Sequence, residues 1–563
     1  MTIVPSTLVG TGATELPVGD LIAEALADAG VTTVFGVVSI HNMPILDGIL
    51  RQGRIRFVPA RGEAGAMNMA DAYARVSRSL GVVITSTGTA AGNAAGAQVE
   101  ALTAGSPVLH ITTQVDVAFM DRDRAAIHDV PRQPDMLKAV SKAYFRIWEA
   151  RGALATLEAA MSAALSAPSG PVSLEIPVDV QRGLAPRPAA PCRPAIVRVT
   201  PDAAKLDLAA RLIASARRPL IFLGGGARGA AEAATALTDR GFAAVTSTNG
   251  RAVVPEDHPH SLGAFNMTPE AQALYDRADL VVVVGTRLRG NETRNNLLRL
   301  PRPMIQIDAD ATQGGRNYPV DLFVHGDATA ALEGLVARLP AKLDTDADFL
   351  AEVAAARAKG EAALLATLGP YAEVARVMRD RVFSDARPFI RDVTISNSTF
   401  GNRYVSLAAP HLGVHALGGG IGQGVPMAIG GAIAGGDLKS VALVGDGGTQ
   451  LCLGELTTLA DEDCNLVVVM MNDHAYGVIS NIQDAQFDGR RAYCRLRTPD
   501  FGLLARSIGL AHVKVDRIED FAAAFDRALA TPGAVMLEVD MTAVGPFAQP
   551  FGGPPAGAAG GAK

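Results

Sequence analysis

Short apolar runs rich in β-branched residues alternate along most of the chain with alanine-rich stretches whose apolar positions recur at helical spacing. Such runs are typical of buried parallel strands, and the stretches between them are typical of the helices that connect parallel strands. The pattern therefore predicts an α/β protein made of doubly wound parallel sheets with helices on both faces.

Two passages interrupt this alternation: the proline-rich "APRPAAPCRPAI" at 185–196 and the polar "KLDTDADFLAEVAAARAKGEAALLA" at 342–366. They divide the chain into three predicted domains, at 13–186, 199–340 and 375–545. The strand candidates in these three domains are "TTVFGVV", "IRFVPA", "GVVITSTG" and "SPVLHITT"; "PLIFLGGG", "AAVTSTNG", "LVVVVGTR" and "MIQIDAD"; and "DVTISNS", "SVALVGDGG", "NLVVVMMND" and "AVMLEVDM". Residues 546–563 lack periodicity, so we expect a flexible tail.

Composition narrows the class of protein. The 563 residues are 48% hydrophobic, which is enough to fill several cores. A net charge of -6 and the lack of a long Lys/Arg run argue against a nucleic-acid partner. Four cysteines without a C-x-x-C spacing argue against a disulfide framework or a zinc site. No apolar run approaches the ~20 residues of a membrane helix. We therefore expect a soluble, cytoplasmic protein with no membrane partner.

One stretch carries candidate chemistry. "SVALVGDGG" predicts a strand that enters a glycine turn before a helix, where Gly445, Gly447 and Gly448 allow backbone N–H groups to approach a phosphate. The next predicted strand ends at Asn472 and Asp473, and adjacent strand ends flank the usual ligand crevice. Asp446 and Asp473 can therefore meet. Beside a phosphate they would need a bridging divalent cation, so the residues predict a magnesium diphosphate site, with an ordinary Asp-Gly turn as the alternative.

This arrangement resembles the diphosphate and Mg2+ motif of thiamine diphosphate (ThDP) enzymes, including the 27 residues that separate Asp446 from Asp473. The resemblance implies ThDP and Mg2+ as cofactors. It implies the Ala475 carbonyl as the third protein ligand of the metal, and Tyr476 as a cofactor contact. Most relatives carry Asn where this chain has Asp473, so we expect one extra negative charge here, with Asn472 as a substitute ligand.

Two further segments extend the resemblance. "RGEAGAMNMADAYAR" is similar to the segment that supplies the family's catalytic glutamate, which places Glu63 beside the cofactor's N1′; the alternative role is an interaction with the helix dipole. "HALGGGIGQGVPMAIGGAIAGG" is similar to the loop that holds the cofactor's two rings bent, with Ile421 beneath them and the Gly419 carbonyl at the 4′-amino group. Active sites of this family lie between subunits, which implies a homodimer at minimum and favours a homotetramer.

Three histidines resemble active-site positions of related enzymes. His41 and His415 occupy positions of the two histidines of benzaldehyde lyase, and His128 matches a position that is His in some decarboxylases. Together they could relay protons, since imidazole donates or accepts near neutral pH. The alternatives are loop capping for His41 and His128, and turn filling for His415. His474 is expected to pack near the metal.

The middle domain contains "GGGARG", which fits G-x-G-x-x-G through Gly224, Gly226 and Gly229. In similar enzymes this domain holds FAD, ADP or no nucleotide, and we favour a structural role for the loop over FAD or ADP binding.

The polar residues bear on the reaction. The arginine and tryptophan of acetolactate synthases are matched by Asn291 and Ile482, and the glutamate of pyruvate decarboxylases is matched by Ile479. The resemblance therefore implies a ThDP- and Mg2+-dependent carbon-carbon lyase or carboligase, a lyase or transferase similar to benzaldehyde lyase or acetolactate synthase. Its substrates would be small 2-oxo acids, aldehydes or acyloins. The alternatives are a 2-oxo acid decarboxylase similar to benzoylformate decarboxylase, and a catalytically silent nucleotide-binding homologue.

Overall fold

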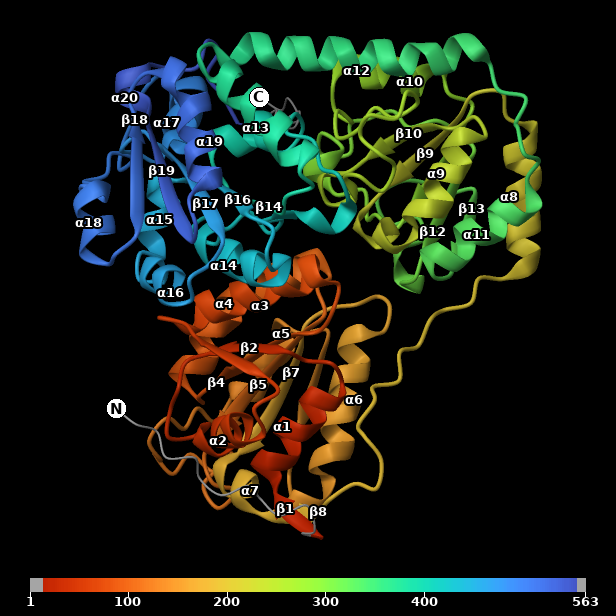
Figure 1. The fold of residues 1–563 in the computed structure, drawn as a ribbon. Helices are drawn as coiled ribbons and strands as arrows, with labels where there is room; N and C mark the ends of the chain where they lie inside the picture. The colour runs from red at the N-terminus through yellow and green to blue at the C-terminus, as the bar shows by residue number, and fades with distance from the viewer. Residues whose placement is uncertain (1–13, 554–563) are drawn as a thin grey trace, which may run out of the picture. The chain divides into compact units, whose positions relative to one another are not determined.

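Three parallel sheets form in the computed structural model, which describes residues 14–553 (Figure 1). Two of the sheets have six strands and one has five, and helices cover the faces of each. The predicted α/β fold class is therefore confirmed.

The first sheet has the order β3-β2-β4-β5-β7-β6. Its strands are β2 (Thr33–Gly36), β3 (Arg56–Pro59), β4 (Gly81–Thr85), β5 (Val108–Gln114), β6 (Ala143–Arg146) and β7 (Val172–Pro177). Helices α1 (Val18–Asp28), α2 (Met43–Gln52) and α6 (Ala153–Leu165) share a core with one face. Helices α3 (Glu63–Ser77) and α4 (Thr89–Ala104) pack together, and both contact the sheet. The short elements are α5 (Gln133–Ala139), α7 (Val178–Arg182) and the antiparallel pair β1 (Glu15–Pro17) and β8 (Leu184–Pro186).

The second sheet has the order β10-β9-β11-β12-β13. Its strands are β9 (Pro219–Leu223), β10 (Ala243–Thr246), β11 (Leu280–Val284), β12 (Met304–Asp308) and β13 (Leu322–His325). One face packs on α8 (Ala203–Ser215), α9 (Ala231–Asp239) and α11 (Ala328–Arg338). The other packs on α10 (Pro269–Arg277) and α12 (Ala347–Leu368). The polar stretch at 342–366 therefore lies mostly in a 22-residue helix.

The third sheet has the order β15-β14-β16-β17-β19-β18. Its strands are β14 (Phe389–Arg391), β15 (Gly413–His415), β16 (Ser440–Gly445), β17 (Leu466–Asn472), β18 (Ala511–Val515) and β19 (Ala534–Asp540). Helices α13 (Tyr371–Ser384) and α19 (Phe521–Ala530) share a core with this sheet. The other helices are α14 (Gly424–Gly435), α15 (Asp446–Leu451), α16 (Glu455–Asp461), α17 (Gly477–Gln486), α18 (Phe501–Ser507) and α20 (Met541–Val544).

One predicted strand of the third domain is wrong. The run "DVTISNS" follows β14 as a turn and leads into a helical segment at Asn397–Gly401. The strand ends at Arg391 because the Asp392 carboxylate turns back to accept the Val393 N–H at 2.8 Å, and Thr394 Oγ1 accepts the Asn397 N–H at 3.0 Å. Local hydrogen bonds of this kind compete with a strand.

The expected tail at 546–563 is ordered over its first part. The Phe547 ring lies 4.4 Å from the ring of Tyr371, and the Gln549 N–H donates to the Thr367 carbonyl at 3.0 Å. Phe547 is buried, and burial of this apolar ring stabilises the packing. Residues 554–563 lie outside the described part of the chain.

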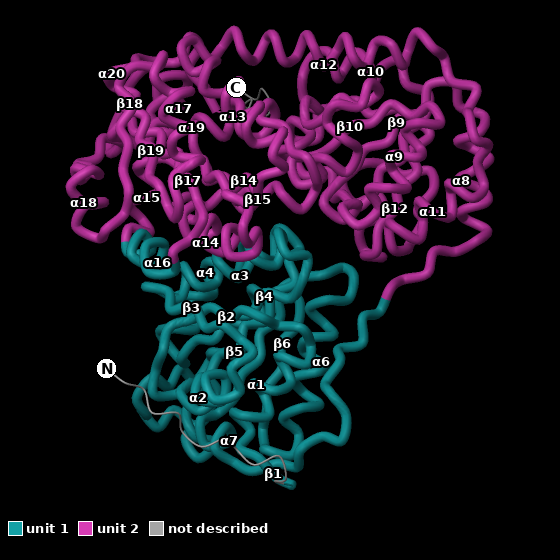
Figure 2. The backbone as a smooth tube through the Cα atoms, in the orientation of Figure 1, with its two compact units in different colours: residues 1–197, 454–462 teal, residues 198–453, 463–563 magenta. Residues whose placement is uncertain are grey.

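By their contacts the described residues form two units (Figure 2). The first extends to Val197 and also contains Gly454–Glu462, while the second contains Arg198–Leu453 and the chain from Asp463 onward. No helix between residues 14 and 553 is long and apolar enough to cross a membrane.

A buried ion pair joins two parts of the second unit. Arg251, which is 1% exposed, donates to both carboxylate oxygens of Glu256 at 2.6 Å, and to the carbonyls of Gly401 and Val405. Removing one partner of such a pair leaves a buried charge without compensation.

We predict that Glu256→Ala lowers the free energy of unfolding by about 3–5 kcal/mol. Thermal unfolding followed by circular dichroism would measure the change. The control is Asp276→Asn, which removes one partner of an exposed ion pair with Arg299 and should change the unfolding midpoint little. Equal effects of the two variants would contradict a stabilising role for the buried pair.

Candidate active site

Asp446 and Asp473 lie at the carboxyl ends of the neighbouring parallel strands β16 and β17. Asp446 is the first residue of α15 and is 1% exposed. Its Oδ1 accepts the Asp473 N–H at 3.3 Å, and Asp473 Oδ1 accepts the Ala475 N–H at 3.1 Å. The structure therefore brings together the two carboxylates that the sequence predicts to meet.

The two carboxyl groups are poorly compensated. Burial raises the pKa of both, and burial followed by the Asp446 charge raises the pKa of Asp473 to about 7. Asp446 Oδ2 is buried and has no hydrogen-bond partner in the structure. A divalent cation would satisfy this oxygen and neutralise the pair.

The donor set fits Mg2+ better than a metal that prefers nitrogen or sulfur. Within residues 14–553 no group of three or more His, Cys, Asp and Glu side chains could hold a metal ion. A cation at Asp446 and Asp473 would therefore complete its shell with backbone, phosphate and water oxygens, as Mg2+ commonly does. The Ala475 carbonyl remains the predicted third protein ligand.

A cavity of about 200 Å³ opens at these carboxylates. Among its lining residues are all the cofactor contacts predicted in the third domain: Gly419, Ile421, Gly445, Asp446, Gly447, Gly448, Asp473, Ala475 and Tyr476. The sequence analysis missed the lining residues Thr394, Ile395 and Ser396, which follow β14. Ser396 Oγ is buried without a hydrogen-bond partner, so it can donate to an anionic ligand in the cavity.

A second missed residue, Asp392, positions the glycine-rich loop around Ile421. Its side chain is buried and accepts the N–H groups of Val393 at 2.8 Å and Gly422 at 3.1 Å, with further bonds from the backbone of residues 423 and 424. Burial raises the pKa of Asp392 to about 6, although the hydrogen bonds from these N–H groups act to lower it. A Cβ on Gly448 would lie 2.6 Å from Asp392 Oδ2, so the glycine turn must remain small here.

Neighbours of Asp473 serve other contacts. Asn472 is buried, donates to Glu538 Oε1 at 2.8 Å and accepts the His474 N–H at 3.2 Å. It is absent from the cavity lining, so the substitute ligand considered from the sequence is not favoured. His474 is exposed, and its Nδ1 contacts Thr498 Oγ1.

Glu63 is the first residue of α3 in the first unit and is half-buried. Its Oε2 accepts a hydrogen bond from Asn93 Nδ2 at 3.1 Å. This contact orients the carboxylate and leaves acceptor capacity for a ligand. The catalytic role of Glu63 stays a prediction.

His41 and His128 lie together in the first unit. Their ring centroids are 5.3 Å apart and the ring planes are perpendicular. His41 is 6% exposed, and burial followed by the neighbouring His128 lowers its pKa. Its Nδ1 lies 3.4 Å from Ser86 Oγ. The structure thus places the two histidines side by side, and their role in proton transfer stays a prediction.

The loop that carries His128 is tied to the first sheet through Gln133. Gln133 Oε1 accepts the Gly88 N–H at 2.6 Å and the Thr87 hydroxyl at 3.1 Å, and Nε2 donates to Glu175 Oε1 at 2.6 Å. The Thr87 hydroxyl also reaches the His128 carbonyl at 3.5 Å. This buried network fixes the backbone on which His128 sits.

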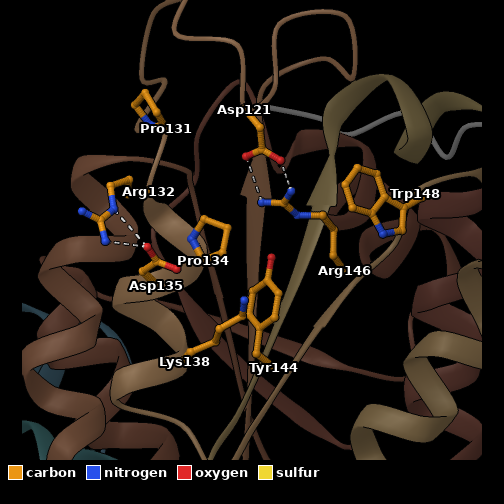
Figure 3. Close-up of a pocket in the computed structure, with 9 residues that line it drawn as sticks. All are labelled: Asp121, Pro131, Arg132, Pro134, Asp135, Lys138, Tyr144, Arg146 and Trp148. Atoms are coloured by element: carbon orange, nitrogen blue, oxygen red, sulfur yellow. Dashed lines mark hydrogen bonds and ion pairs between the residues drawn. The ribbon is translucent and has the colours of Figure 1, made fainter.

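The same network reaches a second pocket, which has a volume of about 430 Å³. Figure 3 draws the residues that line it. Arg146 pairs there with Asp121 of the loop, and its Nε donates to Glu175 at 2.6 Å. Its guanidinium lies 5.0 Å from the ring of Trp148. The pocket is therefore lined by Arg146, which shares Glu175 with the network that holds the loop carrying His128.

His415 ends β15 in the second unit, and its Nδ1 lies 3.1 Å from Asn397 Nδ2. If the Asn397 amide donates, the imidazole proton sits on Nε2. Because His41 and His128 belong to the first unit, the relay of three histidines stays a prediction.

The glycine loop of the middle domain packs against protein backbone. A Cβ on Gly224 would overlap the Gly285 carbonyl, and the Gly226 N–H donates to that carbonyl at 2.9 Å. Arg228 of the loop donates to the carbonyls of Asn249 and Gly413. These contacts give the loop a structural role, and the absence of FAD or ADP binding stays a prediction.

Arg289, two residues before Asn291, extends toward the loop that contains Ile421. Its Nη2 donates to the Leu417 carbonyl at 2.8 Å and its Nε donates to Asn291 Oδ1 at 3.2 Å. A middle-domain arginine therefore reaches this loop although position 291 is Asn.

Comparison with known proteins identifies all three domains. Residues 16–136, 206–335 and 395–539 match the models "Thiamine pyrophosphate enzyme" N-terminal TPP binding domain, central domain and C-terminal TPP binding domain, respectively. The chain is 32% identical to a probable 2-ketoarginine decarboxylase of Pseudomonas aeruginosa, over 88% of this chain and 89% of the relative. It is 27% identical to a probable acetolactate synthase large subunit of Methanocaldococcus jannaschii (89% and 87%) and 28% identical to the acetolactate synthase isozyme 2 large subunit of Escherichia coli (92% and 94%).

The pKa of Asp473 leads to a prediction for the cation-free protein. Folding raises this pKa from 3.8 to about 7, so the folded state binds the proton more tightly than the unfolded state does. Stability is therefore lost as pH rises from 3.8 toward about 7. In EDTA, Asp473→Asn should have a higher Tm than the unsubstituted protein above pH 7, and the difference should shrink toward pH 4.

Thermal unfolding across pH would test this, with Asp488→Asn as the control because Asp488 is an exposed carboxylate. Added Mg2+ should narrow the difference in Tm by binding the carboxylate pair. Identical Tm values for Asp473→Asn and the unsubstituted protein at every pH would contradict the conclusion that burial raises the pKa of Asp473.

Proposed function

Since the chain belongs to the ThDP-dependent enzyme family, we propose that it is a ThDP- and Mg2+-dependent carbon-carbon lyase or carboligase acting on small 2-oxo acids, aldehydes or acyloins. Bound ThDP would supply the nucleophilic carbon and the electron sink that this chemistry needs. Asp446, Asp473 and the Ala475 carbonyl would hold Mg2+, and Glu63 would exchange a proton at the pyrimidine nitrogen. We propose a homodimer at minimum, with a homotetramer favoured.

The observation that carries the proposal is the apolar wall of the cavity. Ile421 and Ile479 line it and are 40% and 48% exposed, so both present apolar surface to a ligand. Among the described lining residues, Asp446 and Asp473 are the only acids, and both are assigned to the cation. The wall therefore lacks a proton donor at Ile479.

This composition favours carboligation over simple decarboxylation. Once a 2-oxo acid has lost carbon dioxide, its acyl fragment takes either a proton, which gives an aldehyde, or a second carbonyl compound, which gives an α-hydroxy ketone. Without an acid at Ile479, protonation is slow and a carbonyl acceptor competes well. His41 would donate a proton to the acceptor oxygen during ligation and remove it during cleavage.

A second candidate function is 2-oxo acid decarboxylation. The His41 and His128 rings, 5.3 Å apart, form a pair that could protonate the acyl fragment instead of the acceptor. A relative at 32% identity carries the name of a decarboxylase. The two candidates differ in their products, so product analysis separates them.

We predict that an accepted 2-oxo acid, given with an excess of acceptor aldehyde, yields mainly an α-hydroxy ketone. His41→Ala should reduce α-hydroxy ketone formation more than it weakens ThDP binding. Pyruvate, benzoylformate, glyoxylate, benzaldehyde and benzoin form a suitable first panel, with products separated by chiral chromatography. Simple aldehyde as the main product under excess acceptor would overturn the lyase proposal and support the decarboxylase.

Glu63→Gln should lower turnover at least about a hundredfold, the lower end of what a lost acid-base contact costs. The variant should keep its circular dichroism spectrum and its elution volume in gel filtration, because Glu63 is a half-buried residue at a helix start. Turnover near that of the unsubstituted protein would remove Glu63 from the mechanism. The catalytically silent alternative predicts no turnover in either protein.

A further inference from the structure

Helix α16 belongs by its contacts to the first unit, although the chain on both sides of residues 454–462 belongs to the second (Figure 2). Glu455, its first residue, is 4% exposed. A carboxylate buried to this degree needs hydrogen-bond donors. Two of its donors are the backbone N–H groups of Arg61 and Gly62, directly before Glu63 in the chain.

The Glu455 carboxylate binds the backbone directly before α3. Oε1 accepts the N–H groups of Arg61 at 3.2 Å and Gly62 at 3.1 Å, and Oε2 lies 3.3 Å from the Arg61 nitrogen. The Thr458 hydroxyl donates to Oε2 at 2.8 Å. Glu63 follows Gly62 in the chain, so these bonds fix the peptide groups that lead into Glu63.

Helix α3 has no side-chain cap of its own. Its N-cap residue is Gly62, in an extended conformation with φ -159°, and no side chain of this residue can accept an N–H group. A carboxylate beside a helix N-terminus also interacts favourably with the helix dipole. Glu455, from a segment distant in sequence, therefore supplies the side-chain hydrogen-bond acceptor that the residues before α3 lack.

Gly65 leaves room for this carboxylate. A Cβ on Gly65 would overlap Glu455 Oε1, and the hydrogen bonds to residues 61 and 62 hold that oxygen in place. The second glycine of "RGEAG" thus provides the space that the Glu455 carboxylate occupies.

We propose that Glu455 is a positioning residue for Glu63, an inference that rests on the proposed function of Glu63. By holding the peptide N–H groups of Arg61 and Gly62, Glu455 fixes the backbone from which the Glu63 side chain reaches the cofactor's pyrimidine ring. Asn93 fixes the carboxylate end of the same side chain at 3.1 Å. Both ends of Glu63 are then held before a ligand binds.

The first measurement is amide hydrogen exchange at residues 61–63 in protein freed of ThDP and Mg2+. Glu455→Ala should raise exchange at Arg61 and Gly62 about tenfold, the effect expected for a lost charge-assisted hydrogen bond. Glu455→Gln keeps one acceptor oxygen and should give a smaller rise. Asp461→Asn is the matched control, because Asp461 lies in the same helix and pairs with the side chain of Arg61.

The second measurement is the rate at which added ThDP, with Mg2+, exchanges its thiazolium C2 proton for deuterium. Glu455→Ala should slow this exchange about tenfold with little change in the Kd for ThDP, Glu455→Gln should restore part of the rate, and Asp461→Asn should leave it unchanged.

Unchanged amide exchange in Glu455→Ala would overturn the proposal, and so would faster amide exchange combined with an unchanged C2 rate. Failure of the proposed function would appear separately, as a C2 exchange rate that Glu63→Gln does not alter. An unaltered C2 rate in Glu63→Gln would rule out a positioning role for Glu455. The amide exchange of residues 61–63 would still show whether Glu455 holds the backbone before Glu63.

Discussion

Two carboxyl groups with too little compensation, Asp446 and Asp473, determine how the rest of the candidate site is built. They lie at the ends of β16 and β17, whose side chains are buried along almost their whole length. In such surroundings the pair is stable only with a shared proton or a bound cation. Because neighbouring parallel strands end at the same edge of a sheet, the fold itself forces the two groups together. The need of this pair for a proton or a cation is thus a consequence of topology.

The cavity above this pair is shaped by small residues and backbone groups more than by polar side chains. The glycine turn after β16 brings peptide groups close to the space where a phosphate would lie. Asp392, at the end of the neighbouring β14, uses its carboxylate to bind the loop that follows Ile421. The buried Asp392 carboxylate therefore binds backbone N–H groups of this loop.

Sequence reasoning identified what depends on local pattern and spacing. Strands β16 and β17 have continuous apolar runs, so their ends, and with them Asp446 and Asp473, could be located. The end of β14 could not, because "VTIS" has the composition of a strand and only the hydrogen bonds of Asp392 and Thr394 stop it. Ser396 and Glu455 were missed for a related reason. Their roles come from residues close in space but distant in sequence, and periodicity carries no information about such contacts.

Glu455 also shows how one short segment can serve two parts of the chemistry. It follows Asp446 by nine residues, yet its carboxylate contacts the peptide groups beside Glu63. These contacts are made to the backbone of residues 61 and 62, and the only small residue that the carboxylate requires is Gly65, where a Cβ would overlap Glu455 Oε1. The start of α3 can therefore keep its backbone geometry when the side chains of neighbouring residues change. Differences in substrate are then expected to arise from the apolar wall at Ile421 and Ile479, away from the residues proposed to position Glu63 and to bind a cation.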